Sequence, residues 1–308
     1  MSKIIVGVDG SDRSDDALAL ASSIAHRTAA EIVLARAYPY DDAAGRLGDS
    51  VRRHDLREAA QETLDRVREH AGTELRVTTR TIADPSPSRA LHLLAERERA
   101  SLVVIGSSHH GAVGRVFAGT TAERLLHGSP CAVAVAPRGM THGESISRIA
   151  VGWDRSPEAD AALGAAIAIA RSVGAELDIV EVLDIHWAGT PAIIPGSGAE
   201  LAAHQPAARA RARLDEIVAG LPADLRAETA LVLGDPVGDL VKRSEEAALL
   251  VQGSRGYGPR RAVLLGGVSG RVLRRSACPV IVVPRGIERP LEAIFPAASM
   301  MEPSPPAV

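Results

Sequence analysis

The sequence predicts an α/β fold made of two tandem doubly wound domains, each built on a five-stranded parallel sheet. Short apolar runs alternate with stretches in which apolar residues recur at helical spacing, which is typical of βαβ units with right-handed crossovers. The runs are apolar at nearly every position, as strands covered on both faces require. The pattern then restarts, because Gly253 follows Gly106 by 147 residues and Cys278 follows Cys131 by the same interval.

In the first half, each predicted strand leads into a turn and a helix. Asp9, Gly10 and Ser11 form the turn after the first strand, and Ser14 or Asp15 is expected to cap the helix that follows. The expected strands cover residues 3–8, 31–37, 74–82, 102–105 and 131–136, and the expected helices cover residues 17–25, 50–70, 88–99 and 120–127.

The second half repeats this order, and Pro157 suits the first turn of its first helix. Its expected strands cover residues 149–153, 176–182, 225–233, 247–251 and 280–283, and its helices cover residues 157–170, 199–219, 237–246 and 269–275. The resulting domains are 1–139 and 147–286, joined by a linker at 140–146. A tail at 287–308 is rich in proline and alanine and is expected to lack a fold of its own, although its few apolar residues can dock.

Composition narrows the class of protein. A length of 308 residues suits two domains, and a net charge of −3 gives no case for nucleic acid as a partner. No apolar run approaches the roughly 20 residues of a membrane helix, so no membrane partner is expected, and the N-terminus lacks the layout of a secretory signal. With only Cys131 and Cys278, a cytoplasmic protein is expected, and the two cysteines are interpreted as core residues rather than a metal or redox pair.

A glycine-rich loop follows the fourth strand of each half. In the second half, the apolar run 247–251 leads into Gly253, Gly256 and Gly266 just before a helix. Backbone N–H groups in such a loop, together with the positive end of a helix, suit a phosphate. In doubly wound sheets, ligands lie where the strand order reverses, and this places Asp9 beside Gly106 and Asp154 beside Gly253. Neither a GxxxxGK[ST] motif nor a dinucleotide fingerprint is present.

Four features together resemble tandem-domain universal stress proteins of the UspA-like family. They are VGVDGS at 6–11 with VGWDRS at 151–156, GDP at 234–236 with ADP at 83–85, the spacing GxxG-x9-G from Gly253, and the closing strands CAVAVAP at 131–137 and CPVIVVP at 278–284. The resemblance covers about residues 3–138 and 147–285, and the combination is more specific than any single motif.

The resemblance implies a Rossmann-like fold of the adenine nucleotide α-hydrolase type and an adenine nucleotide, ATP with or without Mg²⁺, as cofactor. It also implies that the closing strands of the two domains pair antiparallel within the chain, and that two chains form a homodimer. The aspartates match the family position near adenosine, and the ends of the second strands match the position whose backbone meets adenine. The residues expected at the nucleotide are Asp9, Gly10, Ser11, Ala37, Gly106, Ser108, Gly119, Thr120, Thr121, Asp154, Val182, Gly253, Arg255, Gly256, Gly266, Gly267, Val268 and Ser269.

Each half departs from the family pattern. His109 stands where the first half should have its second glycine, although Thr120 and Thr121 keep the expected hydroxyl. In the second half the glycines are intact, but Gly267 replaces the hydroxyl residue, for which Ser269 or Arg255 can compensate. The second half is the favoured site, because a backbone cradle needs open glycines more than it needs one hydroxyl.

Three functions are compatible with the fold. The favoured one is an ATP-binding stress-response module, without catalytic residues or a metal site of its own, in which slow ATP hydrolysis is left open. The second is an interaction scaffold whose nucleotide sites have decayed, with Asp9 and Asp154 serving only in helix-capping turns. An adenylating ligase is disfavoured, because neither DGSDRS nor DRSPEA supplies the serine- and glycine-rich phosphate loop of that class.

Overall fold

Strands and helices alternate through both halves of the chain. The computed structural model describes residues 2–28, 30–40, 50–108, 113–184, 199–254, 267–284 and 291–295. The first half contains β1 (Lys3–Gly7), α1 (Asp12–Ala25), β2 (Glu31–Tyr38), α2 (Ser50–Glu69), β3 (Val77–Ala83), α3 (Pro87–Glu98), β4 (Leu102–Gly106), α4 (Thr120–Leu126) and β5 (Ala132–Ala136). The second contains β6 (Arg148–Gly152), α5 (Pro157–Val173), β7 (Glu176–Asp184), α6 (Ala199–Ala219), β8 (Ala227–Gly234), α7 (Pro236–Arg243), β9 (Leu249–Gly253), α8 (Gly267–Leu273) and β10 (Val280–Val283), followed by the 3₁₀ helix η1 (Leu291–Ile294).

The strands form one continuous sheet in the order β3-β2-β1-β4-β5-β10-β9-β6-β7-β8. Within each half all neighbours are parallel, and β1 lies between β2 and β4 just as β6 lies between β7 and β9. The strand order therefore reverses between β1 and β4, and again between β6 and β9. The predicted fold class is confirmed, and the two five-stranded sheets join edge to edge.

The junction is an antiparallel pair formed by β5 and β10. Val135 lies opposite Val280, and Val133 lies opposite Val282. Every residue of both strands is buried. Because an apolar edge strand left unpaired invites association, this pairing covers the apolar edge of each half. The expected antiparallel pairing of the two domains within one chain is observed.

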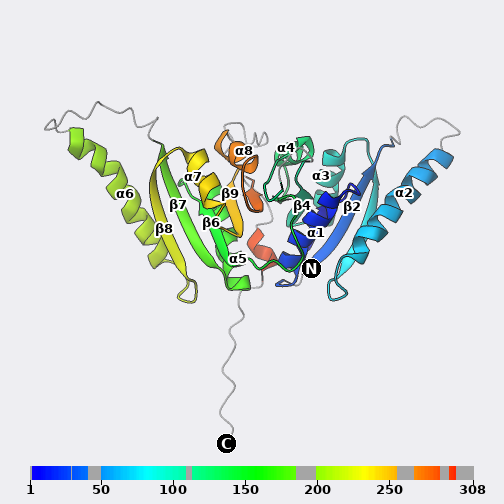
Figure 1. Cartoon of the computed structure of the whole chain (residues 1–308), viewed down its shortest axis with the longest axis horizontal. Coiled ribbons are helices and arrows are strands. Elements are labelled where there is room, and N and C mark those ends of the chain that lie inside the picture. The colour runs from blue at the N-terminus through cyan, green and yellow to red at the C-terminus, as the bar shows by residue number, and fades with distance from the viewer. Residues whose placement is uncertain are drawn as a thin grey trace, which may run out of the picture.

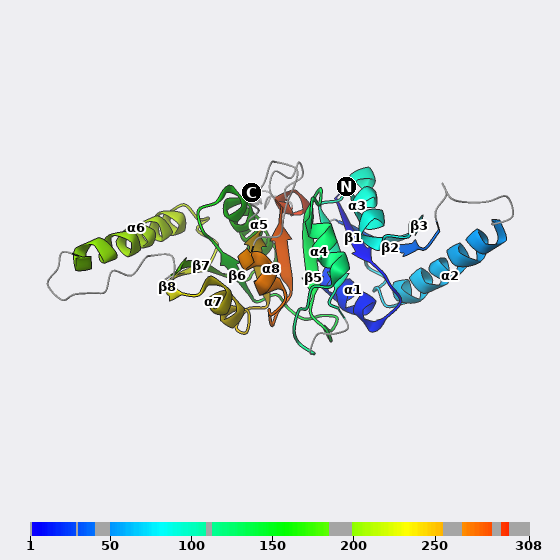
Figure 2. The same cartoon turned by 90° about the horizontal axis from the view of Figure 1, so that it is seen from above.

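Helices cover both faces of the sheet (Figures 1 and 2). Alternate residues of a strand point to opposite faces, so Ile4 and Val6 join one hydrophobic cluster while Ile5 joins the other. The first cluster holds residues of α1, α2, α5 and α6, and the second holds residues of α3, α4, α7 and α8. This two-sided burial explains why the strands read as continuous apolar runs.

Several element boundaries differ from the predicted ones. The N-cap position of α1 belongs to Ser11, so the prediction of a cap at Ser14 or Asp15 is wrong. The Ser14 hydroxyl accepts instead from the N–H groups of Asp9 and Gly10, at 3.0 and 3.1 Å, and so stabilises the preceding turn. Helix α8 begins at Gly267, two residues earlier than expected, and β3 begins at Val77, three residues later.

Part of the C-terminal tail docks onto the core. Leu291, Ile294 and Phe295 are buried in the first hydrophobic cluster, where η1 contacts α5. Residues 285–290 and 296–308 lie outside the described residues. In the described part of the chain, no helix combines the length and apolarity needed to cross a membrane.

Candidate functional site

A cavity of about 330 Å³ lies at the carboxyl ends of β1 and β4, where the strand order of the first half reverses. Its apolar wall includes Leu91 and Ile105. Seven of the residues expected at a nucleotide line it: Asp9, Ala37, Gly106, Ser108, Gly119, Thr120 and Thr121. The fold thus brings together residues from the beginning and the end of the first domain, as the switch-point rule predicts.

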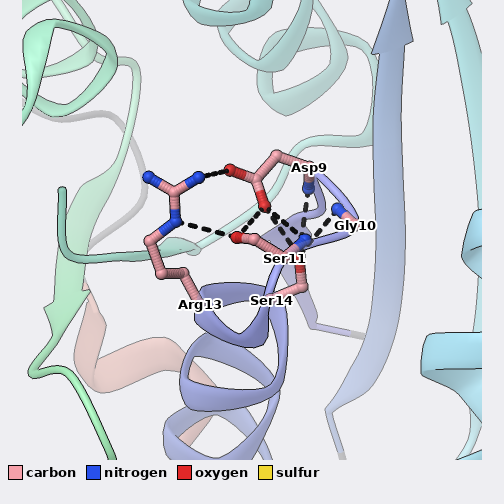
Figure 3. Close-up of polar contacts among 5 residues, drawn as sticks. All are labelled: Asp9, Gly10, Ser11, Arg13 and Ser14. Atoms are coloured by element: carbon pink, nitrogen blue, oxygen red, sulfur yellow. Dashed lines mark hydrogen bonds and ion pairs between the residues drawn. The ribbon is translucent and has the colours of Figure 1, made fainter. Parts of the chain in front are cut away.

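The turn after β1 is held by a dense set of hydrogen bonds around Asp9 (Figure 3). Asp9 Oδ1 accepts from the Ser11 N–H at 3.0 Å and from the Ser11 hydroxyl at 2.5 Å. The other carboxylate oxygen, Oδ2, lies 2.6 Å from Arg13 Nη2. Gly10 has φ +82°, a left-handed conformation that glycine adopts without steric cost. Gly10 and Ser11 therefore shape the turn that carries Asp9.

The electrostatic surroundings keep Asp9 ionised. Burial alone would raise the pKa of this carboxyl, but hydrogen bonds from Ser11 and the charge of Arg13 outweigh it, with a smaller contribution from Ser14. The pKa of Asp9 consequently lies below its ordinary value. At neutral pH the site presents a carboxylate that can accept hydrogen bonds from hydroxyl groups.

The loop after β4 is ordered by its own side chains. Ser107 Oγ donates to the Ala136 carbonyl at 2.8 Å and accepts from the Phe117 N–H at 3.1 Å. The Ser108 N–H donates to the Phe117 carbonyl at 2.7 Å. A Cβ on Gly106 would lie 2.3 Å from the Arg13 carbonyl oxygen, so only glycine allows α1 to pack this closely on β4. His109 lies outside the described residues.

The helix after this loop leaves its first N–H groups without a capping side chain. Gly119 occupies the N-cap position of α4 and has no side chain to cap it, and among the described residues no capping hydrogen bond to this end of the helix is present. Thr120 and Thr121 follow directly and line the cavity. A hydrogen-bond acceptor in the cavity can therefore meet backbone N–H groups and threonine hydroxyls on the same wall.

The second half has the same turn but a different arrangement behind it. Asp154 Oδ1 accepts from the Ser156 N–H at 3.1 Å, as Asp9 does from Ser11. Ser269 Oγ donates to the Gly253 carbonyl at 2.8 Å, so its hydroxyl proton is used within the protein. Gly267 and Val268 are the first residues of α8.

The nucleotide contacts expected from the rest of the second glycine loop stay predictions. Arg255, Gly256 and Gly266 lie outside the described residues, as does most of the loop between β9 and α8. The preference for the second half as the nucleotide site rested on these glycines. It therefore also stays a prediction.

The two positions expected beside adenine lie in corresponding strands. Ala37 is in β2 and lines the cavity. Val182 is in β7 and packs, partly buried, against the second hydrophobic cluster. The structure thus gives the Ala37 position a neighbouring cavity, and the expected backbone contact with adenine stays a prediction.

Two side chains of the first turn were missed by the sequence analysis. Arg13 bonds to both Asp9 and Ser11 and lines the cavity, and Ser14 bonds to the turn amides. The available signal was the spacing of four residues between Asp9 and Arg13 at a helix start, which brings opposite charges together. Among the described residues, no group of three histidine, cysteine or acidic side chains is placed to hold a metal ion.

The fold and cavity define a class of tandem α/β protein with a cavity where the strand order of the first half reverses. The profile of the universal stress protein family matches residues 1–137 and 145–284. The chain therefore belongs to the universal stress protein family.

Relatives of full length support this assignment. A universal stress protein of Mycolicibacterium smegmatis is 30% identical over 300 residues, which is 91% of this chain and 96% of that protein. One from Mycobacterium tuberculosis H37Rv is 27% identical over 297 residues, with 91% of this chain and 96% of the relative covered. The crystal structure of a universal stress protein from Archaeoglobus fulgidus DSM 4304 superposes with a TM-score of 0.66 at 22% identity, covering 92% of this chain and 98% of that one, and shares the fold.

Proposed function

We propose that this universal stress protein binds ATP and acts as a nucleotide-responsive regulatory module rather than an enzyme. The observation that carries the proposal is the cavity at the carboxyl ends of β1 and β4, which gathers Asp9 with Gly106, Ser108 and Gly119. Its volume of about 330 Å³ falls within the range of small-molecule sites, about 300–1,000 Å³.

The residues present suit the parts of an adenine nucleotide. The ionised Asp9 can accept hydrogen bonds from ribose hydroxyls, and Ala37, which lines the same cavity, can offer its backbone to the base. The uncapped N–H groups beside Gly119 and the hydroxyls of Thr120 and Thr121 suit phosphate oxygens. Bound ATP supplies a polyanionic tail, and Mg²⁺ would enter on that tail, since this ion binds through few carboxylates and the phosphates themselves.

The position of the loop between β4 and α4 supports a regulatory role, because this loop contacts the second half. Arg115 and Val116 lie between Gly106 and Gly119, and both bond to residues of the second half. A ligand that contacts the loop between Gly106 and Gly119 can therefore act on contacts between the domains. We also propose a cytoplasmic location, supported by two free buried cysteines, and a homodimer, which light scattering of the purified chain tests.

Calorimetric titration of the purified full chain with ATP tests the proposal. Saturable binding is expected, and Asp9→Ala and Gly119→Val should each weaken it by at least tenfold, because the first loses the ribose acceptor and the second places a branched side chain against Ser108. Gly72→Val is the matched control, since a Cβ there has no neighbour within 4 Å. Absence of saturable binding to the unmutated chain would leave an interaction scaffold as the function.

A further inference from the structure

The loop between β4 and α4 is anchored on its outer side to the second half of the chain, and α4 and α8 lie on either side of this junction (Figures 1 and 2). The Arg115 guanidinium pairs with Glu245 at 2.9 Å and donates from Nη1 to the Arg275 carbonyl at 3.2 Å. The Val116 N–H donates to the Ser276 carbonyl at 2.8 Å. Two neighbouring residues therefore tie this loop to the segments that follow α7 and α8.

On its inner side the same loop holds the wall of the cavity through the next residue, Phe117. The Phe117 N–H donates to the Ser107 hydroxyl at 3.1 Å, and the Phe117 carbonyl accepts from the Ser108 N–H at 2.7 Å. Both serines line the cavity, and Ser107 is only 1% exposed. Because Val116 and Phe117 are consecutive, a displacement at the contact with the second half moves the bonds that place both serines.

The anchor on the second half combines a buried side chain with a charged one. Val116 is buried and belongs to the hydrophobic cluster that also holds Cys278 of the second half. Arg115 and Glu245 are about half-exposed, so their ion pair can be changed without opening the core. The internal repeat does not reproduce this arginine, since Ala262 stands 147 residues after it. The ion pair is therefore a feature added to the repeated fold rather than a consequence of it.

We propose that the second half sets the shape of the cavity in the first half, with Arg115 and Glu245 as positioning residues. Neither belongs to the described residues that line the cavity, so both act on it through Val116 and Phe117. The inference rests on the proposed function and adds to it how that site is regulated. Any event that shifts Glu245 or the Ser276 carbonyl lowers the affinity for nucleotide. Bound ATP in return strengthens the contact between the halves, since coupling between two sites is reciprocal.

Hydrogen exchange of the full chain without nucleotide, followed amide by amide by NMR, tests whether the second half positions the cavity wall. Glu245→Lys sets a like charge against Arg115 and should speed exchange of the Val116 and Ser108 amides by about threefold or more, because both amides are held by this loop. Arg171→Ala, which breaks a comparably exposed ion pair within the second half, is the matched control and should change neither amide. Faster exchange at Val116 alone, or at neither amide, would overturn the proposal, because the disturbance would not reach the cavity.

Calorimetric titration with ATP tests whether this positioning reaches the ligand. Glu245→Lys and Arg115→Ala should each weaken ATP binding about two- to fivefold, the range that a half-exposed ion pair allows. Arg115→Lys keeps the charge opposite Glu245 and should lose less. The double variant Arg115→Ala with Glu245→Lys should lose less than the two separate losses combined, since both changes remove one pair. Arg171→Ala should leave the ATP affinity unchanged.

The two measurements separate a failure of the inference from a failure of the proposed function. ATP bound to the unmutated chain should slow exchange of the Val116 amide, as reciprocal coupling requires. Full ATP affinity in Glu245→Lys, or fully additive losses in the double variant, would overturn the regulatory role of the pair. If the unmutated chain binds no ATP, the proposed function fails, and the exchange measurement, which uses no nucleotide, still decides whether the second half positions Ser108.

Discussion

The amide of Val116 donates to the carbonyl of Ser276 at 2.8 Å, and this bond joins the glycine loop of the first half to the second half. Arg115 reinforces it by pairing with Glu245 at 2.9 Å, and Arg274 pairs with Glu123 at 2.6 Å. These contacts lie beside the antiparallel junction of β5 and β10. The loop that borders the cavity is therefore also part of the domain interface.

The apolar junction should contribute far more stability than the ion pairs around it. Ile281 is fully buried in β10, so Ile281→Ala should lower the free energy of unfolding by about 2–5 kcal/mol through lost burial and the cavity left behind. Arg115→Ala, at a half-exposed pair, should cost about 1 kcal/mol or less. Urea denaturation of the two variants measures both changes. A larger loss of unfolding free energy for Arg115→Ala than for Ile281→Ala would contradict the conclusion that the apolar junction contributes most of the stability.

The left-handed turn after β1 should tolerate glycine alone. Gly10→Ala should destabilise the chain by about 1–2 kcal/mol, because φ is +82° and the new Cβ would lie 2.9 Å from Thr63 Cγ2. Gly72→Ala, where a Cβ meets nothing within 4 Å, should instead be neutral or stabilise by about 0.4–1 kcal/mol. Thermal unfolding of both variants measures the difference. Equal changes in melting temperature would show that the turn at Gly10 accepts a Cβ without strain.

Asp16 links α1 to the segment that leads out of the first domain. It is 4% exposed, and its Oδ1 accepts from the Gly139 N–H at 3.0 Å. Burial raises its pKa above the ordinary value despite the backbone donors Gly139 and Met140, with Asp15 and Asp12 adding repulsion. Asp16→Asn should therefore be neutral or stabilising at pH 7, since it keeps an acceptor without the buried charge. Asp16→Ala should cost about 1–3 kcal/mol by leaving the donor unpaired.

The pH dependence of these variants follows from the direction of the shift. Because the native state binds this proton more tightly than the unfolded state, the contribution of Asp16 to stability is largest below the ordinary pKa and is lost as pH rises through the native value. The stability of the unmutated chain relative to Asp16→Asn should therefore fall as pH rises from about 3 to 7. Denaturant unfolding at several pH values measures this trend, and a relative stability that rises with pH would contradict it.

Both cysteines should be inert in the folded protein. Burial raises the pKa of Cys131 and of Cys278 to about 12, and only the thiolate reacts with alkylating reagents. Iodoacetamide at pH 8 should modify neither residue in the native chain and both after denaturation. Mass spectrometry counts the added groups, and rapid labelling of either cysteine in the native state would argue against its burial.

The strands could be predicted because two-sided burial demands continuous apolar runs. The antiparallel pairing of β5 with β10 was expected from the family resemblance, and the apolar character of both strands is consistent with it. The contacts of Arg13 with Asp9 and Ser11 were missed although the spacing of four residues from Asp9 was visible, since an arginine in the first turn of a helix is ordinarily a solvated side chain. The ion pair of Arg155 with Glu181 could not be predicted from the sequence either. Arg155 adopts φ +69°, a backbone conformation that arginine disfavours. Its partner Glu181 is adjacent only in space.

The antiparallel junction has a geometric consequence for the two aspartate turns, at Asp9 and at Asp154. Parallel strands within a half all end at one border of the sheet, and reversing direction between β5 and β10 sends the other half's strand ends to the opposite border. No single small molecule can touch both Asp9 and Asp154. Any communication between them has to cross the domain interface, through the paired strands β5 and β10 or through the contacts of Arg115 and Val116 with the second half.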